Sequence, residues 1–137
     1  MLRKLVCGLL MLLPLIGNAE ECPHYQVDEI TTEELLSWYE QKIPMVVLDA
    51  RGRRFFDGRS LPGAIWISCS APDDVVLQGV PDKNSLIVVY CSNIDCPASN
   101  WLAGRLLKFG YQHVYEYPNG IDGWVEEGHP TELKAKS

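Results

Sequence analysis

The segment Ser85-Leu86-Ile87-Val88-Val89-Tyr90-Cys91 is the most informative part of this 137-residue chain, because a continuous apolar run ends there on a cysteine. Apolar runs of this length, bounded by turn residues, are typical of strands that are covered on both faces of a parallel sheet. The loop 92–97 follows, and a helical pattern begins at Ala98. A thiol between the end of a strand and the start of a helix lies near backbone N–H groups and the positive end of the helix dipole, both of which favour thiolate. The segment therefore predicts cysteine chemistry at Cys91.

Outward from this segment, the chain alternates between apolar runs and amphipathic stretches. Met45-Val46-Val47-Leu48 is a second buried-strand pattern, and it closes on Asp49. Thr31 opens a helix with a capping-box pattern, and Gly110 ends the helix that begins at Ala98. The other expected elements are a strand at 64–67, a helical or irregular crossover at 71–79, a last strand at 114–117 and a short helix at 121–127. This alternation of strands and helices predicts an α/β fold with a parallel sheet.

Size and charge limit the classes of function. The length suits one domain, and no repeat or shift in composition suggests a second. The net charge is −6, and no run of Lys and Arg is present that would neutralise phosphates. We therefore expect no nucleic-acid partner.

The first residues of the chain are typical of a secretory signal peptide. Two basic residues precede the apolar stretch Leu5–Ile16, and small residues follow it. The stretch is shorter than the roughly 20 residues that a membrane-spanning helix needs, and Pro14 interrupts it. We therefore expect residues 1–19 to be a signal peptide and residues 20–137 to be a single domain, periplasmic or otherwise exported, and soluble after cleavage. An uncleaved amino-terminal anchor is the alternative.

Removal of the leader leaves an even number of cysteines, which can pair in an oxidising compartment. They are Cys22, Cys69, Cys91 and Cys96. Three connectivities are possible, and the sequence does not separate them. We favour a Cys22–Cys69 disulfide over two free thiols, because exported thiols otherwise oxidise at random. A zinc site is not expected, since no close cysteine pair has the usual ligand spacing.

Four segments of the mature chain form a recognisable set. They are Val46–Arg51, Gly58–Ile65, Ile87–Cys91, and Gly110–Tyr115 together with Gly120–Trp124. In this order the set resembles the rhodanese-like domain family, and the resemblance covers nearly all of the mature chain. It implies a single α/β domain with a central, mostly parallel sheet of about five strands that is flanked by helices on both faces.

The resemblance implies sulfur transfer. In this family the loop cysteine takes a sulfane sulfur from a donor such as thiosulfate or polysulfide, becomes a persulfide and passes that sulfur to a thiophilic acceptor; by position, Cys91 is this cysteine. A covalent intermediate on an activated thiol divides one transfer into two easier displacements. No metal or organic cofactor is implied, and the expected partners are a small sulfur-containing anion or persulfide donor and a thiol acceptor. The expected binding loop, whose backbone N–H groups would cradle the donor, is Ser92, Asn93, Ile94, Asp95, Cys96 and Pro97.

The loop departs from the family in charge and in length. Family members that are active on thiosulfate usually carry basic residues in this loop, whereas this loop has none and contains Asp95. A like charge repels a dianionic donor and raises the pKa of the thiol. Aligning Ser99 with the serine that commonly opens the family's helix makes the loop longer than usual. Both features argue against efficient turnover of thiosulfate, and the missing arginine argues against a protein phosphatase.

Three residues outside the loop are candidates for supporting roles. Asp49 resembles the family's strand-end acid, and we expect it to accept hydrogen bonds from the backbone of the adjacent loop. Arg51 and Arg59 are placed to lend positive charge from neighbouring loops. For Arg51 we favour the alternative of a structural salt bridge with a carboxylate such as Asp49.

Cys96 follows Cys91 within one loop, and two interpretations of it stay open. As a resolving thiol, it would attack a persulfide on Cys91, release sulfide and form a disulfide, or it would oxidise together with Cys91 during export. As a structural residue, it would pack as a small apolar side chain at the start of the helix. The sequence thus supports two hypotheses: an exported rhodanese-like sulfurtransferase, and a catalytically weak rhodanese-like module for binding an unknown protein partner or for thiol–disulfide relay through Cys91 and Cys96.

Overall fold

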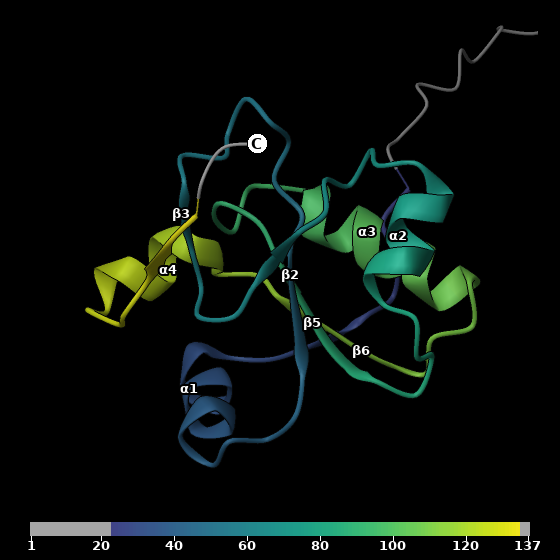
Figure 1. Ribbon diagram of the computed structural model, residues 1–137. Coiled ribbons are helices and arrows are strands. Elements are labelled where there is room, and N and C mark those ends of the chain that lie inside the picture. Colours follow the sequence, from purple (N-terminus) through teal and green to yellow (C-terminus); the bar gives the residue numbers. More distant parts are fainter. Residues whose placement is uncertain (1–22, 135–137) are drawn as a thin grey trace, which may run out of the picture.

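The computed structural model describes residues 23–134. Within these residues, helices flank a five-stranded sheet, and a small two-stranded ribbon lies beside it (Figure 1). The predicted signal peptide 1–19 and Cys22 lie outside the described residues, so the structure does not test the leader or the Cys22–Cys69 disulfide. None of the helices in the described part of the chain is both long and apolar enough to cross a membrane.

The central sheet is parallel throughout. Its strands are β1 (Asp28–Glu29), β2 (Val46–Asp49), β4 (Ile65–Trp66), β5 (Leu86–Tyr90) and β6 (His113–Tyr117). Their order is β1-β6-β5-β2-β4, and every pair is parallel, which confirms the predicted α/β fold. β5 lies in the middle, and its residues 87–90 are buried, as expected for a strand that is covered on both faces. Cys91 therefore follows the central strand of the sheet.

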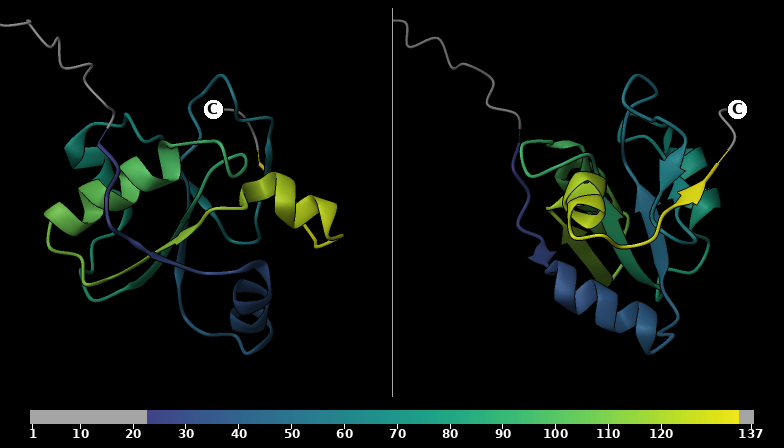
Figure 2. Two further views of the ribbon diagram at one scale, coloured as in Figure 1. Left: turned by 180° about the vertical axis from the view of Figure 1, so that it is seen from behind. Right: turned by 90° about the vertical axis from the view of Figure 1, so that its left-hand side faces the viewer.

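The helices cover the two faces of the sheet in pairs. They are α1 (Thr32–Glu40), α2 (Asp73–Gly79), α3 (Ala98–Lys108) and α4 (Gly120–Glu126). Figures 1 and 2 show α1 and α4 on one side of the sheet, and α2 and α3 on the other. Two buried apolar clusters fill these layers: Val88 and Tyr90 belong to the α1 and α4 side, whereas Ile87 and Val89 belong to the α2 and α3 side. Alternate side chains of β5 thus build both halves of the core.

Backbone capping explains where two of the helices begin and end. Thr31 Oγ1 accepts the Glu34 N–H at 3.1 Å, and the Glu34 carboxylate accepts the Thr31 N–H at 2.8 Å, so the predicted capping box starts α1. Gly110, with a φ of 90°, follows the last turn of α3. The N–H groups of Gly110 and Tyr111 donate to carbonyl oxygens of that turn, which is the Schellman pattern that glycine favours. Both boundaries follow from the sequence.

The short strands are where the structure differs from the sequence prediction. The sequence predicts neither β1 nor the antiparallel pair of β3 (Arg59–Ser60) and β7 (Glu132–Leu133). The expectation that 114–117 is the last strand is wrong, because β7 follows α4. These three strands have two residues each and expose at least one of them, so they lack the apolar pattern that predicts a strand. They form through pairing with distant parts of the chain.

Candidate active site

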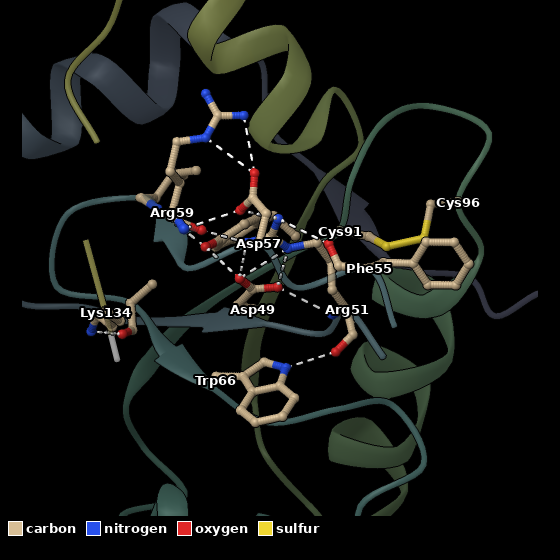
Figure 3. Close-up of polar contacts among 12 residues, drawn as sticks. Asp49, Arg51, Phe55, Asp57, Arg59, Trp66, Cys91, Cys96 and Lys134 are labelled. Atoms are coloured by element: carbon tan, nitrogen blue, oxygen red, sulfur yellow. Dashed lines mark hydrogen bonds and ion pairs between the residues drawn. A yellow bond between two sulfur atoms is a disulfide. The ribbon is translucent and has the colours of Figure 1, made fainter. Parts of the chain in front are cut away.

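Cys91 directly follows β5, and it is only 1% exposed. It forms a disulfide with Cys96, with the two Cα atoms 6.2 Å apart (Figure 3). Cys96 is partly exposed and precedes α3 by two residues. Of the two interpretations of Cys96, the structure shows the pairing with Cys91, and Cys96 also packs against the core cluster on the α3 side. The two loop cysteines therefore form one chemical unit.

The base of the loop is held by the start of α4. The N–H groups of Ile121 and Asp122 donate to the carbonyl oxygens of Cys91 and Ser92, at 3.0 and 2.9 Å. The Asn93 side-chain amide donates to Asp122 Oδ2 at 3.0 Å. These contacts fix the backbone that carries the thiol, so α4 positions Cys91 although it lies about 30 residues later in the chain.

Gly120 is expected to tolerate no side chain. Its φ is 64°, and a Cβ there would lie 2.6 Å from the carbonyl oxygens of Cys91 and Ser92. Gly120→Ala therefore strains the backbone and also displaces the loop. In urea unfolding we expect a loss larger than the roughly 1–2 kcal/mol of a left-handed alanine alone. The matched control is Gly63→Ala, which has a similar φ of 70° and open space around its Cβ. Equal losses in the two variants would contradict the tight approach of Gly120 to the loop.

Two of the loop N–H groups that the sequence assigns to an anion cradle are bonded within the loop. The Asp95 N–H donates to Asn93 Oδ1 at 3.1 Å, and the Cys96 N–H donates to the Asn93 carbonyl oxygen at 3.1 Å. Such turns are typical of asparagine, whose side chain mimics a backbone acceptor. Ile94 and Asp95 are exposed, and Pro97 is the N-cap of α3. In the disulfide form, the N–H groups of Asp95 and Cys96 therefore stabilise the turn.

Arg51 and Arg59 are both paired with carboxylates (Figure 3). The buried Arg51 guanidinium donates to both oxygens of Asp49, at 2.7 to 3.1 Å, and lies 3.3 Å from Asp57. The exposed Arg59 pairs with Asp57 at 3.1 Å. Burial alone would lower the pKa of Arg51, but the hydrogen bonds and charge of Asp49 raise it. The predicted salt bridge of Arg51 is confirmed, and carboxylates balance the charges of both arginines.

Asp49 accepts hydrogen bonds that connect β2 with its neighbours. The Arg51 backbone N–H donates to Oδ1 at 3.1 Å, which is the loop contact that the sequence predicts. The Tyr90 hydroxyl donates to Oδ2 at 3.0 Å and accepts the Leu61 N–H at 3.1 Å. Burial, and then the negative charge of Asp49, raise the pKa of Tyr90. The sequence does not predict this role for Tyr90, because the residue lies in an apolar run and resembles the other buried residues of the strand.

Tyr90→Phe is expected to destabilise the fold by about 1–3 kcal/mol, because it leaves the buried Leu61 N–H without its acceptor and removes a donor to Asp49. The Tyr90 phenol has a higher pKa in the folded chain than its ordinary value of 10.0. Its stabilising effect is therefore complete below pH 10.0 and decreases as the pH rises above it. Urea unfolding below and above this pH measures both effects. From the lower to the higher pH, the free energy of unfolding should decrease less in Tyr90→Phe than in wild type. An equal decrease would contradict the raised pKa of Tyr90.

Two pockets meet at Cys96, each with a volume of about 320 Å³. Glu29, Asp95 and Glu116 line the first together with His24, between residues 23–24 and the start of α3. Asp95 also lines the second, together with Phe55, whose 65% exposed ring lies beside Cys96 (Figure 3). Small molecules can therefore reach the disulfide at Cys96, through surroundings that are acidic on one side and apolar on the other.

A buried carboxylate supports the first turn of α3. Glu116 in β6 accepts the Ser99 hydroxyl at 2.8 Å and the Asn100 side-chain amide at 3.1 Å. Asn100 also bonds the Tyr25 backbone through two hydrogen bonds, at 2.8 and 2.9 Å. This network fixes the start of α3, which follows the loop, and attaches the amino-terminal segment beside it. The only signal for it in the sequence is a pair of small polar residues at the start of a helix.

The arrangement of sheet, loop and anchoring helix agrees with a known family. The family profile described as "Rhodanese-like domain" matches residues 31–127. The chain belongs to the rhodanese-like domain family. The four segments that carry the resemblance in the sequence all lie within the matched range. A comparison with curated proteins gave no match.

Solved structures share this fold over most of the chain. The rhodanese-like domain of the Alr3790 protein from Anabaena sp. is 24% identical, with a TM-score of 0.67 over 79% of this chain and 80% of that chain. A thiosulfate sulfurtransferase from Pseudomonas aeruginosa is 24% identical, with a TM-score of 0.64 over 80% of this chain and 21% of that chain. A rhodanese with anions from E. coli is 26% identical, with a TM-score of 0.53 over 66% of this chain and 99% of that chain. This rhodanese-like domain therefore shares its fold with a protein that is named as a thiosulfate sulfurtransferase and with one that is named as a rhodanese.

Proposed function

We propose that this rhodanese-like domain is an exported, periplasmic-type sulfurtransferase that carries sulfane sulfur as a persulfide on Cys91. The observation that carries the proposal is the place of Cys91, which follows the central strand of a rhodanese-like sheet and whose backbone is held by α4. The leader pattern in residues 1–19 supports export. The loop disulfide also supports it, because disulfides persist in oxidising compartments.

Sulfur transfer starts from the dithiol form of the loop. One thiolate of a reductant attacks the Cys91–Cys96 disulfide to give a mixed disulfide, and a second thiolate resolves it, so the reductant is oxidised and both cysteines are released. The Cys91 thiolate is then the nucleophile. The oxidised loop is a resting form of the proposed sulfurtransferase, and a thiol reductant activates it.

Loading and discharge are two displacements on sulfur. The Cys91 thiolate attacks the outer sulfur of the donor, the donor's S–S bond breaks, and sulfite or a thiolate leaves. The acceptor thiolate then attacks the outer sulfur of the persulfide, and Cys91 leaves as thiolate. Cys96 offers a competing discharge, in which its thiolate attacks Cys91 Sγ, hydrosulfide leaves and the disulfide forms again. The acceptor must therefore react faster than Cys96 for sulfur to be passed on.

The charges around the loop favour donors of low charge. The loop 92–97 contains no Lys or Arg, and the nearby Arg51 and Arg59 are paired with carboxylates. Asp95 and Glu116 are among the residues that line a pocket at Cys96. At the same distance, a dianion is repelled twice as strongly as a monoanion. We therefore propose a persulfide or another singly charged donor in preference to thiosulfate.

Asp95→Asn is expected to raise kcat/KM for thiosulfate by about threefold to tenfold at low ionic strength, because one repelling charge is removed. On a logarithmic scale, the gain for the singly charged benzenethiosulfonate should be about half as large. The control is Glu40→Gln, the exposed last residue of α1. Figure 1 shows α1 at the end of the sheet opposite the segment that joins β5 to α3. Equal gains for the two donors, or the same gain in the control, would contradict an electrostatic preference at the loop.

The proposal is tested with reduced protein in a sulfur-transfer assay. Protein freed of excess reductant is given benzenethiosulfonate and cyanide, and thiocyanate is measured. We expect a rate that is first order in protein and that requires prior reduction of the disulfide. Formation of thiocyanate at the rate of buffer alone, with benzenethiosulfonate and with a small-molecule persulfide, would contradict sulfur transfer.

The disulfide favours a second candidate function, thiol–disulfide relay. In that role the Cys91–Cys96 pair exchanges electrons with a protein dithiol and carries no sulfane sulfur. The two functions leave different products: relay leaves an oxidised partner, and sulfur transfer leaves a sulfur-loaded acceptor. Oxidised protein that converts a dithiol peptide to its disulfide, together with reduced protein that forms no thiocyanate, would favour relay.

A further inference from the structure

The two sulfur atoms of the loop disulfide differ in their access to solvent. Cys91 is 1% exposed and belongs to the buried core cluster on the α3 side. Cys96 is partly exposed and lines both of the 320 Å³ pockets at the loop. The exposed Ile94 lines one of these pockets and the exposed Phe55 lines the other. An external nucleophile therefore reaches the disulfide through Cys96.

This asymmetry determines which cysteine is attacked and which one leaves. In thiol–disulfide exchange the nucleophile bonds to one sulfur, and the other sulfur departs with the electron pair of the broken bond. Attack on Cys96 makes Cys91 the leaving thiolate. The thiolate that is released is therefore Cys91, the same residue that carries the persulfide in the proposed sulfurtransferase.

The walls of the pockets select the nucleophile by charge. Asp95 lines both pockets, and Glu29 and Glu116 line one of them. Among the described residues, no Lys or Arg lines either pocket. Phe55 and Pro97 make the second opening largely apolar. These walls favour a small sulfur nucleophile that is neutral or singly charged over one that carries several carboxylates.

We propose that the oxidised loop is itself a substrate-binding state, which accepts hydrosulfide at Cys96 and so loads sulfur without a sulfane donor. Hydrosulfide attacks Cys96 Sγ, a new S–S bond forms, the Cys91–Cys96 bond breaks, and Cys91 leaves as thiolate. The disulfide receives the two electrons, so no other oxidant is needed. The Cys91 thiolate then attacks the outer sulfur of the Cys96 persulfide, which moves that sulfur to Cys91 and frees the Cys96 thiolate. The inference rests on the proposed function, because both routes end in the same Cys91 persulfide.

The experiment uses the oxidised mature protein, residues 20–137, with sodium sulfide at equimolar concentration and without oxygen. Samples are quenched with acid at successive times from the first second, thiols and persulfides are alkylated, and the mass and the position of the added sulfur are measured. We expect a gain of about 34 Da over the disulfide form, the mass of one molecule of hydrogen sulfide, in addition to the mass of the two alkyl groups that cap the new thiol and the new persulfide. In the earliest samples the added sulfur should be on Cys96, and later on Cys91. The controls are reduced wild type and Cys96→Ser, which have no loop disulfide and should gain no sulfur on Cys91.

Three results would overturn the inference. They are an added sulfur that is on Cys91 in the earliest samples, a disulfide that stays intact in sulfide, and a gain of equal size in the Cys96→Ser control. Its failure is distinguishable from failure of the proposed function. If reduced protein loads Cys91 from benzenethiosulfonate, but oxidised protein does not react with sulfide, only the hydrosulfide route is refuted. Oxidised protein that loads from sulfide, while reduced protein takes no sulfur from any donor, refutes the proposed donor-dependent transfer.

Discussion

Replacing Cys91 with serine should reduce sulfur transfer to the uncatalysed background, a loss of at least about 10³-fold, because the covalent carrier of the sulfur is removed. A serine hydroxyl forms no persulfide, and no other thiol follows the central strand of the described sheet. The measurement is thiocyanate formation from benzenethiosulfonate and cyanide by reduced protein. Because serine is close to cysteine in volume, the fold should remain, and urea unfolding of the reduced proteins checks this.

The matched control for this prediction is Cys96→Ser. It removes the resolving thiol but leaves the carrier, so reduced Cys96→Ser should retain transfer within about threefold of wild type. It should also keep its persulfide longer, because the Cys96 route of discharge is lost. Activity in Cys91→Ser together with loss in Cys96→Ser would make Cys96 the carrier and overturn the assignment of the site.

Arg51→Met is expected to have the largest effect on stability, a loss of about 3–5 kcal/mol, because it leaves the Asp49 carboxylate buried without its partner. The two side chains are 2% and 0% exposed, and their closest atoms are 2.7 Å apart. Arg51 also donates to the Arg59 carbonyl oxygen, so the variant disconnects β2 from the start of β3. Urea unfolding of wild type and variant measures the loss.

The exposed ion pair next to it provides the control. Arg59 and Asp57 are each 46% exposed, so Arg59→Gln should lower the free energy of unfolding by less than about 1 kcal/mol. The two substitutions remove the same charge from neighbouring loops and differ in burial. A loss below that limit for Arg51→Met would mean that water or another cation replaces the guanidinium, which contradicts the buried pair.

Local patterns in the sequence predict much of the fold. The apolar run before Cys91, the capping box at Thr31 and the glycine after α3 each act within a few residues, so their outcome is visible in the sequence. The same holds for the salt bridge between Asp49 and Arg51, which are two residues apart. The resemblance to the rhodanese-like family then places these elements in one sheet.

The parts that the sequence does not predict depend on contacts between distant segments. The approach of Gly120 to the Cys91 carbonyl and the buried Glu116 beneath α3 join residues that are tens of positions apart. The two-residue strands exist only as pairs with distant partners. The pairing of Cys91 with Cys96 stays open in the sequence, because four mature cysteines allow three connectivities. Residue spacing alone carries no information about such contacts.

The most direct test of the account is the position of sulfur on reduced protein after exposure to benzenethiosulfonate. The protein is alkylated and digested, and tandem mass spectrometry assigns each added sulfur to a cysteine. We expect one added sulfur, about 32 Da, on Cys91, and none on Cys96 in the Cys91→Ser variant. Two results would show that Cys91 does not carry the sulfur. One is sulfur on Cys96 or Cys69 with Cys91 unmodified, and the other is protein that takes up no sulfur while its loop disulfide forms and breaks normally.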